Sequence, residues 1–490
     1  MVSLLQPLVF SGKMPVEGAA ELYIRGSYGS DTYGSLSLPA GESIDFFTYF
    51  NLFSSAKWRG WTGAENIGLI LHGSGRAGVE LTGHDISSGR SCALLNVEYN
   101  LEDEEILRIP EQDCFDVITF KVAADTECRI SGGGWYGKTE LERDVRAAVV
   151  ICTFNREEYL WPNLESIIGV LPISWQVFVI NQGTPFSEEK MNSMPETVRF
   201  FKNPNRGGSG GFTRGIVEAL QAEEDFTHAL LMDDDIRLEP SVLNRTNRLL
   251  VHLKPEYRKH FAAGAMIRMD NPLIQHECGA YWSGIRVKHS FHNLDLGLNG
   301  ALLENEAVPG LGNHKEYAAW WYCAVPLSQD MLDDLPMPFF VNGDDIEYSL
   351  RRAPGLLRLN GISVWHEPFL AKASALKRYL TIRNGLIINV RADVPFLVSL
   401  FFVCGRWARM LLQRNNEGRV FIKLAVMHFL DSPDKLWDMC GPKLFEIQPD
   451  IIKTDNFIRL ILKFVRYYKK AKTEYRNISL DLKTWRINVQ

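Results

Sequence analysis

Short uninterrupted apolar runs alternate with longer helix-like segments between residues 147 and 232. The predicted strands are Ala147–Cys152, Gln176–Ile180, Val198–Phe201 and Ala229–Met232, and the predicted helices are Glu157–Val170 and about Phe212–Glu224. Continuous apolar runs are typical of strands buried on both faces, and strands that alternate with helices form parallel sheets. The pattern therefore predicts a doubly wound α/β domain. Each run ends in polar residues, so one edge of the sheet should collect the chemistry.

The first 140 residues have a different pattern, with short apolar segments separated by glycine and serine. The predicted strands are Glu21–Ile24, Ser43–Phe50, Gly68–His72, Cys92–Tyr99 and Phe115–Val122, and the glycines at 132–134 are an expected break. Short strands at regular spacing indicate a β-sandwich or barrel. Four aromatic residues could line a sugar-binding face, but we favour core and rim packing for them: Trp58, Trp61, Trp135 and Tyr136.

Beyond about residue 390 the pattern predicts helices. Phe396–Val403 is strongly apolar but is soon followed by Arg406 and Arg409, so it is too short to span a bilayer. Ile451–Tyr475 alternates apolar residues with lysine and arginine, which predicts a basic amphipathic helix. Such a helix can lie on a membrane or pack on the preceding domain. With the charged segment 138–145 as a linker, the expected domains are 1–140, 141–390 and 391–490.

Composition adds a charge asymmetry to this picture. The chain of 490 residues is 46% hydrophobic and 23% charged, as in a globular protein, and its net charge is −6. Residues 396–490 hold 17 Lys+Arg and 9 Asp+Glu, so this region carries +8 and the rest of the chain −14. A basic region rich in apolar and aromatic residues favours an anionic membrane surface over nucleic acid as a partner.

The compartment is inferred from the cysteines and the N-terminus. Eight cysteines are scattered without a CxxC pair, which indicates reduced thiols rather than a disulfide framework or a zinc site. The first seven residues lack a basic start and a long apolar core, so we expect no signal peptide. Both observations predict a cytoplasmic protein.

The most informative motif follows the run Ala229–Met232, where Asp233, Asp234 and Asp235 stand in sequence. A buried strand that ends in carboxylates places hard oxygen ligands at the edge where open α/β folds bind ligands. Because side chains at i and i+2 of a strand point the same way, Asp233 and Asp235 can face one divalent cation while Asp234 faces elsewhere. An acidic turn that caps a helix is the structural alternative.

Polar motifs end the neighbouring strands as well. Arg156 closes the motif after the first strand and Gln182 lies just after the second, where a guanidinium can bind phosphate and an amide can read a pyrimidine. The run from Asn205 to Phe212 predicts a glycine-rich loop before a helix, which favours a bound anion. It matches neither the Walker sequence nor the dinucleotide-binding pattern.

Two further motifs complete the set. Asp344 and Asp345 form a second acidic pair after an apolar segment, and His366 ends another predicted strand. An imidazole with two carboxylates is a sensible ligand set for a manganese-like ion. Each motif alone could be structural, but their combination in this order indicates one active site.

The order TFNR, NQG, NxxGGSGGFxRG, MDDDI, WWY, DDIEY and WH resembles the inverting GT-A glycosyltransferases. It resembles more closely the bacterial galactofuranosyltransferases that use UDP-galactofuranose. The resemblance is specific over about residues 146–390 and only architectural over the first 140. It implies an α/β GT-A domain, Rossmann-like with a mainly parallel sheet, behind an N-terminal β-sandwich or barrel and before a C-terminal helical region.

The resemblance also implies roles for individual residues. Asp233, Asp235 and His366 would hold Mn²⁺ or Mg²⁺ on the diphosphate of UDP, and Asp345 would be the catalytic base, paired with Asp344. The implied donor-binding residues are Arg156, Gln182, Asn205, Asp234, Glu277, Trp320 and Trp321. Some relatives carry a bulky residue where this chain has Gly343. This difference affects the expected contacts with the acceptor and not those with the donor.

The implied reaction is a single displacement that inverts an α-linked UDP-sugar to a β-product. The expected acceptor is a lipid-linked or polysaccharide glycan, reached by peripheral binding at the inner face of the cell membrane. Two alternatives stay open. The same fold could use UDP-glucose or UDP-galactopyranose, or the chain could be a non-catalytic glycan-binding or assembly protein. The sequence does not decide between a monomer and a homo-oligomer.

Overall fold

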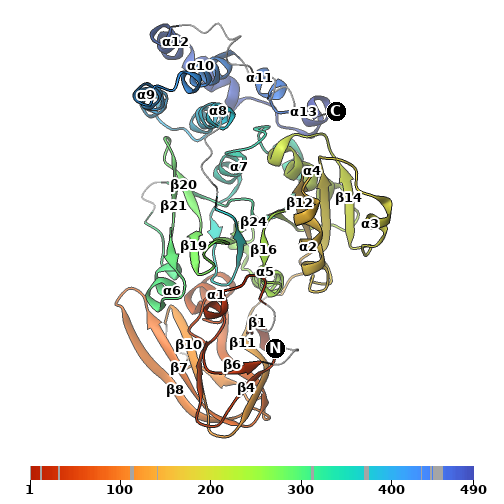
Figure 1. Cartoon of the computed structure of the whole chain (residues 1–490), viewed down its shortest axis with the longest axis vertical. Coiled ribbons are helices and arrows are strands. Elements are labelled where there is room, and N and C mark those ends of the chain that lie inside the picture. Colours follow the sequence, from red (N-terminus) through yellow and green to blue (C-terminus); the bar gives the residue numbers. More distant parts are fainter. Residues whose placement is uncertain are drawn as a thin grey trace.

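The computed structural model describes residues 2–10, 14–30, 34–110, 115–140, 142–310, 314–368, 375–431, 433–441, 444 and 456–489. Three parts follow one another along the long axis of the molecule, in the order of the sequence (Figure 1). A β domain lies at one end, an α/β domain in the middle and a group of helices at the other end. This order agrees with the predicted succession of β, α/β and helical regions.

The β domain consists of two antiparallel sheets. One contains β3 (Gly29–Ser30), β4 (Leu36–Leu38), β11 (Cys128–Lys138), β6 (Glu65–Ser74) and β9 (Leu107–Arg108), with β1 (Val2–Pro7) paired to β11. The other contains β2 (Arg25–Gly26), β5 (Ser43–Asp45), β10 (Val117–Ala124), β7 (Arg76–Asp85) and β8 (Arg90–Asn100). Phe120 of the second sheet contacts Trp135 of the first edge-to-face, with 5.9 Å between ring centroids, so the two sheets face each other.

Several details of the β prediction need correction. Residues 21–24 do not form a strand, because η1, a 3-10 helix over Ala20–Leu22, occupies this position. The glycines at 132–134 do not break the sheet but lie inside β11. Trp58 and Trp135 are fully buried, as core packing requires, and Trp58 lies on α1 (Ser55–Thr62). Neither of these two side chains can therefore line an exposed sugar-binding face.

The main sheet of the middle domain has the order β14-β13-β12-β15-β24-β17-β25. The bounds are β14 (Val198–Lys202), β13 (Gln176–Asn181), β12 (Ala147–Thr153), β15 (His228–Asp233), β24 (Tyr322–Pro326), β17 (Phe261–Ala263) and β25 (Leu356–Leu357). The first four strands are parallel, as predicted. However, β24 runs antiparallel to both β15 and β17, so the sheet is mixed rather than wholly parallel.

Helices and two small sheets surround this main sheet (Figure 1). The helices are α2 (Glu157–Ile168), α3 (Glu188–Asn192), α4 (Gly207–Gln221), α5 (Ser241–His252), α6 (Asn299–Glu306) and α7 (Asp344–Arg352), with 3-10 turns η2 (Pro255–Tyr257) and η3 (Gln329–Asp333). One small sheet has the order β16 (Arg237–Leu238), β26 (Ser363–His366), β18 (Ala265–Arg268), β19 (Ile274–Glu277) and β22 (Leu294–Asp295). The other has the order β21 (Val287–His289), β20 (Ala280–Trp282) and β23 (Glu316–Tyr317).

The glycine-rich run forms the first turns of α4 rather than a loop. Each glycine disfavours a helix by about 1 kcal/mol relative to alanine, so the helix must be stabilised here by close packing against its neighbours. A Cβ on Gly211 would lie 2.1 Å from Cys152 Sγ, and one on Gly215 would lie 2.1 Å from Val150 Cγ1. The glycines therefore let α4 lie directly against β12, which explains why the helix begins five residues earlier than the predicted Phe212.

The C-terminal region consists of α8 (Ala375–Arg391), α9 (Phe396–Leu412), α10 (Asn416–Asp431), α11 (Asp434–Asp438), α12 (Phe457–Arg476) and α13 (Leu482–Val489). The predicted basic helix corresponds to α12, and residues 451–455 of that prediction lie outside the described residues. Tyr379 of α8 hydrogen-bonds His428 of α10 at 2.8 Å. We therefore propose that the helical region begins with α8 and that the middle domain ends before residue 375.

A buried charge network joins the middle domain to the helices. The Glu347 carboxylate of α7 accepts from Arg351 Nε at 2.8 Å and from Arg391 Nε of α8 at 2.6 Å. Arg391 also donates to the carbonyl of Tyr475 on α12 at 2.7 Å. Burial by itself raises the pKa of Glu347, but the two guanidinium groups outweigh it and lower that pKa below its ordinary value. The network therefore holds three helices through one ionised carboxylate.

We expect Glu347→Gln to destabilise the packing of α7, α8 and α12 by about 3 kcal/mol at neutral pH, because it removes the carboxylate that the buried Arg391 and Arg351 share, while Arg351 keeps its ion pair with Asp334. Hydrogen exchange of the α8 amides measures this opening energy. Since the folded pKa is depressed, the stabilisation is present above the unfolded pKa and is lost as the pH falls through the folded pKa. The control is Glu158→Gln, which changes an exposed acid and should leave the exchange rates of the α8 amides as in the wild type. Equal protection of the α8 amides in the wild type and in Glu347→Gln would contradict the prediction.

Candidate active site

The pairing of β16 with β26 gathers the predicted metal ligands at the end of β15. Asp233 ends β15, and the chain continues through Asp234 and Asp235 into β16. Strand β26 pairs with β16, with Trp365 opposite Arg237, so its last residue His366 comes beside the acidic triplet. The triplet is therefore a strand end followed by a bend, and it does not cap a helix.

Asp233, Asp235 and His366 form a compact set of potential ligands. One ligand atom from each lies within 4.8 Å of those of the other two. His366 Nε2 is 3.2 Å from Asp235 Oδ1 and 3.9 Å from Asp233 Oδ2. Two carboxylates and an imidazole suit Mn²⁺, and carboxylates with water suit Mg²⁺. These residues thus fit the divalent ion that the sequence predicted.

The two carboxyl groups have opposite pKa shifts. Burial is the main cause that raises the pKa of Asp233 to about 7, and the neighbouring carboxylates add to it. Burial acts on Asp235 as well, but its contacts with His366 and Arg156 prevail and lower its pKa to about 2. Burial opposes charge on His366 also, yet Asp235 raises the pKa of the imidazole to about 9. Charge is thus partly neutralised within the group itself.

Arg156 and Asp234 lie at the same strand edge. Arg156 Nη1 is 2.5 Å from Asp235 Oδ2 and 3.3 Å from Asp234 Oδ1. Asp234 is almost fully buried, and Asn163 of α2 donates to its backbone carbonyl at 2.7 Å. Arg156 is about half exposed, so its guanidinium can also reach an anionic ligand at this edge.

A cavity of about 710 Å³ adjoins the metal-ligand set. It is lined by six of the predicted site residues, which come from four separate segments: Asp233, Glu277, Trp320, Trp321, Asp344 and Asp345. The antiparallel β24 explains the two tryptophans, because Tyr322 pairs with Met232 and the residues just before Tyr322 therefore lie beside the end of β15. Trp321 Nε1 donates to the carbonyl of Gly264 at 3.0 Å, which fixes the indole at the wall.

The acidic pair occupies the first turn of α7. Burial raises the pKa of both carboxyl groups, and the charge of Asp344 raises that of Asp345 further. Backbone N–H groups of the first turn act in the opposite direction, as Ile346 N donates to Asp345 Oδ1 at 2.8 Å. The helix starts after Gly343, whose φ of +103° disfavours any side chain, so the absence of a bulky residue here follows from the backbone.

The side chains of Gln182 and Asn205 contact the start of α4, and neither residue lines the cavity. Gln182 Nε2 donates to the carbonyl of Gly207 at 2.8 Å, and its Oε1 accepts from Arg206 N at 2.9 Å. Asn205 Oδ1 accepts from Gly207 N at 3.2 Å. Their observed contacts organise the glycine-rich turn, and Gly208 of that turn does line the cavity. Their predicted contacts with a donor stay a prediction.

Several residues of the cavity wall were not predicted from the sequence. They are His276, His289, Tyr317 and Lys377, whereas Phe212 of the wall belongs to the predicted glycine-rich motif. Tyr317 has no signal in the sequence, because its position depends on the packing of β23. The histidines had one available signal, since His276, His289 and His292 fall within 17 residues of a chain with only 11 histidines.

Known families and proteins match two parts of this chain. The family model described as galactofuranosyltransferase 2 N-terminal matches residues 20–138, and that described as glycosyltransferase like family 2 matches residues 145–286. The chain is similar to the galactofuranosyltransferases. It is 28% identical to galactofuranosyltransferase GlfT2 of Mycobacterium tuberculosis over 403 residues, and 27% identical to galactofuranosyltransferase GlfT2 of Mycolicibacterium smegmatis over 394 residues. The predicted resemblance to this family is confirmed.

The match does not extend over the whole of these relatives. It covers 73% of this chain in both cases, but only 60% and 59% of the relatives' lengths. Among solved structures, residues 1–349 of S. aureus TarS align with 11% identity and a TM-score of 0.39, over 68% of this chain and 91% of that one. With an identity and a TM-score this low, the structural alignment says nothing about the site.

We expect the full chain to bind Mn²⁺ and Asp235→Ala to bind it more than about a hundredfold more weakly, because loss of an outer hydrogen-bonding partner alone costs 10- to 100-fold. Calorimetric titration with Mn²⁺ measures both. Since an imidazole and a carboxyl group must each lose a proton to bind a metal, affinity should fall as the pH is lowered from about 9, the pKa of His366, through about 7, the pKa of Asp233.

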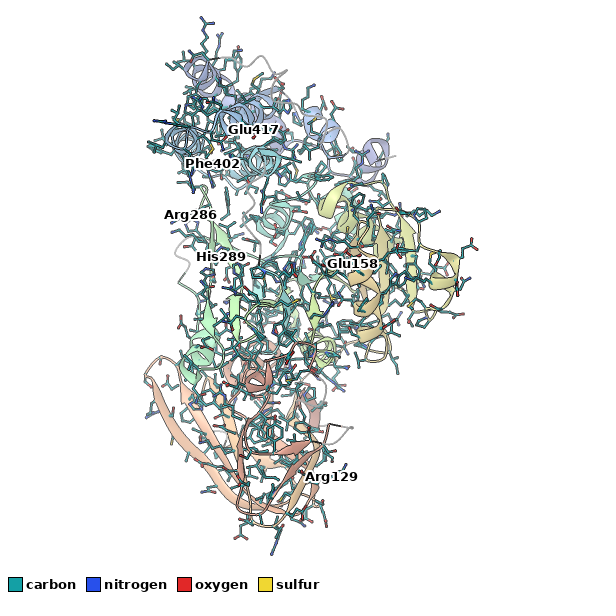
Figure 2. All side chains as sticks on the ribbon, viewed as in Figure 1. Arg129, Glu158, Arg286, His289, Phe402 and Glu417 are labelled. Carbon is teal, nitrogen blue, oxygen red and sulfur yellow. The ribbon has the colours of Figure 1, made fainter. Side chains whose placement is uncertain are left out.

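Glu158→Ala is a suitable control, because Glu158 is an exposed acid on α2 (Figure 2). It should bind Mn²⁺ like the wild type. An affinity that is the same in Asp235→Ala, or that does not depend on pH in this range, would contradict the assignment of this ligand set.

Proposed function

We propose that this protein is a metal-dependent inverting glycosyltransferase that transfers β-galactofuranose from UDP-galactofuranose. The proposed acceptor is a lipid-linked or polysaccharide glycan of the cell surface. The observation that carries this proposal is the double position of Asp233, which belongs both to the metal-ligand set and to the cavity that holds the acidic pair. The names of the two relatives support the sugar, and the motifs support the nucleotide.

In the proposed reaction, a Mn²⁺ or Mg²⁺ ion held by Asp233, Asp235 and His366 would neutralise the departing diphosphate. Asp345 takes the proton from the acceptor hydroxyl as the oxygen attacks the anomeric carbon from the side opposite UDP. One displacement inverts the configuration. The raised pKa of the acidic pair suits a base that must hold a proton after the attack.

The other predicted residues have binding roles in this proposal. Trp320 and Trp321 form an apolar wall on which a sugar ring can pack. Glu277 is buried in the same wall and can accept from sugar hydroxyl groups. Arg156 and Asp234 would contact the nucleotide at the strand edge, with Gln182 and Asn205 beside the glycine-rich turn of α4.

A donor panel distinguishes this proposal from its alternatives. UDP release is measured with Mn²⁺ for UDP-galactofuranose, UDP-galactopyranose and UDP-glucose, each with and without a lipid-linked glycan acceptor. Acceptor-dependent release from UDP-galactofuranose alone is the expected result. Release from another sugar would favour the same fold with a different donor, and binding of a glycan without release would favour a non-catalytic protein.

We expect Asp345→Asn to keep the donor affinity of the wild type and to lose turnover by about 10²- to 10⁴-fold, because an amide cannot take the acceptor proton. Calorimetry with the UDP-sugar and a turnover assay are run on the same preparation, with Glu158→Gln as the control. If donor binding falls together with turnover, Asp345 is a binding residue, and Asp344 becomes the candidate base.

The helical region supports peripheral binding to an anionic membrane. In the described residues no helix is long and apolar enough to cross a bilayer. Large apolar side chains are nevertheless exposed on two helices, namely Leu397, Phe401, Leu411 and Leu412 on α9 and Ile458, Leu462 and Val465 on α12. Exposed basic residues accompany them on α12. Exposed apolar groups next to positive charge are typical of a surface that lies on anionic lipid.

We expect the full chain to float with anionic liposomes at low salt, to be released at high salt and to bind neutral liposomes poorly, since each basic residue near such a surface contributes about 1 kcal/mol. Replacing Lys463, Arg466, Lys469 and Lys470 with Gln should weaken flotation and leave transfer to a short soluble acceptor unchanged. A wild type that ignores anionic liposomes would identify α12 as a packing element only.

A further inference from the structure

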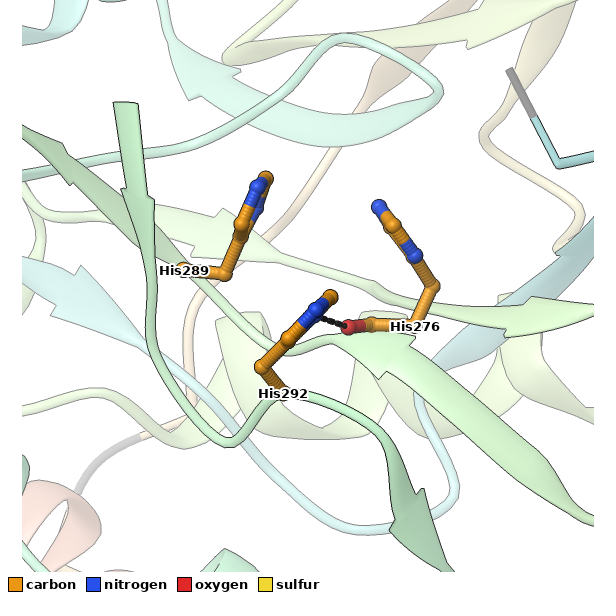
Figure 3. Close-up of side chains that lie close together, drawn as sticks. All are labelled: His276, His289 and His292. Atoms are coloured by element: carbon orange, nitrogen blue, oxygen red, sulfur yellow. Dashed lines mark hydrogen bonds between the residues drawn. The ribbon is translucent and has the colours of Figure 1, made fainter. Parts of the chain in front are cut away.

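Three histidines come together at the edge of the cavity, outside the metal-ligand set described above. His276 lies in β19, His289 ends β21 and His292 lies in the loop before β22 (Figure 3). One ring nitrogen from each lies within 4.8 Å of those of the other two. The ring centroids of His289 and His292 are 4.8 Å apart, and each lies 5.3 Å or less from that of His276. His276 and His289 also line the cavity.

The loop that carries His292 is held in an unusual conformation. Phe291 and Asn293, on either side of it, have φ values of 50° and 57°, which are uncommon for residues other than glycine. Gln275 donates to the carbonyl of Phe291 at 2.9 Å, and the Arg358 guanidinium lies 4.9 Å from the ring centroid of Phe291. These contacts turn the chain so that the His292 ring faces His276.

The hydrogen bonds of two rings resemble those of metal-bound histidines. His289 Nδ1 contacts the Glu277 carboxylate, and His292 Nδ1 donates to the carbonyl of His276 at 2.6 Å. A ligating histidine usually directs its other nitrogen to a carboxylate or a carbonyl in this way, which fixes the ring and leaves Nε2 for the metal. The Asn293 amide lies 3.1 Å from His292 Nε2, so coordination would replace that hydrogen bond.

We propose that His276, His289 and His292 form a second metal site, for Zn²⁺ or a similar transition-metal ion. Three imidazoles suit zinc, copper, nickel and iron, whereas Mg²⁺ prefers oxygen ligands. Zinc bound at about 2.0–2.1 Å from each nitrogen needs nitrogens roughly 3.3 Å apart, which small rotations of exposed side chains can provide. A tetrahedral ion would keep one position for water or a ligand from the cavity.

This site has a consequence for the reaction that rests on the proposed function. Metal bound at His289 Nε2 would fix the His289 ring, and the ring would fix the Glu277 carboxylate, which lines the cavity. Glu277 is 2% exposed and has its carboxylate bound to this imidazole, so its position depends on the orientation of the ring. His289 is then a positioning residue for a sugar-contacting acid.

The test measures metal binding and does not require transfer activity. The full chain is titrated with Zn²⁺ and, separately, with Co²⁺ in excess Mg²⁺, so that Mg²⁺ competes for the carboxylate site. The readouts are bound metal per chain and the visible absorption of four-coordinate Co²⁺. The variants are His292→Ala and His289→Ala. The controls are His314→Ala, which removes another exposed imidazole nearby, and Asp235→Ala, which removes the first site.

We expect the wild type, His314→Ala and Asp235→Ala to bind one Zn²⁺ with the same affinity and to give the same Co²⁺ absorption. His292→Ala and His289→Ala should each lose the absorption and most of the affinity. Glu277→Gln should weaken Zn²⁺ binding by about 10- to 100-fold, as loss of an outer-shell partner does. The proposal is overturned if neither histidine variant changes Zn²⁺ binding, or if Asp235→Ala alone abolishes it.

Failure of the proposed function would give a different pattern. If the chain transferred no sugar but lost Zn²⁺ only in the histidine variants, the second site would stand without its role for Glu277. A circular-dichroism spectrum of each variant separates loss of metal from loss of fold. His289 and His292 are exposed, and replacing either leaves the core unchanged.

Discussion

The gathering of negative charge around one cavity is the constraint on which the rest of this structure depends. Asp233, Glu277, Asp344 and Asp345 all face the cavity, and Asp235 adjoins it. Ionised carboxylates in a buried site repel one another and lose hydration, so the fold must supply compensation. His366 and Arg156 supply positive charge, and the first turn of α7 supplies backbone N–H groups. Divalent ions would complete this compensation.

The topology follows from the need to bring these groups together. Parallel strands alone would place the ends of β12, β13 and β15 at one edge, but they would not bring in the tryptophan pair or the histidine. The antiparallel β24 delivers Trp320 and Trp321 to the end of β15, and the short pairing of β16 with β26 delivers His366. Each departure from a simple doubly wound sheet thus has a consequence at the site.

The helical region is joined to the site through one helix. The first turn of α7 carries the acidic pair and also Glu347, which binds Arg391 of α8. Asn384 of α8 also donates to the carbonyls of Val341 and Asn342, just before the acidic pair. A helical surface that meets a membrane would therefore be mechanically coupled to the segment that presents the proposed base to the acceptor.

The sequence by itself determined the strands of the α/β domain and the residue types of the site. Short continuous apolar runs predict strands buried on both faces, and the order of the motifs predicted the resemblance to the galactofuranosyltransferases. Gln182, Gly207 and His292 show what it left undecided. The start of α4 depends on how closely a helix can approach β12, and the mixed sheet depends on pairing between segments about 90 residues apart. The histidine cluster depends on a loop conformation held by Gln275 and Arg358. These features arise from contacts between distant segments, and only the tertiary structure decides which distant side chains share one place.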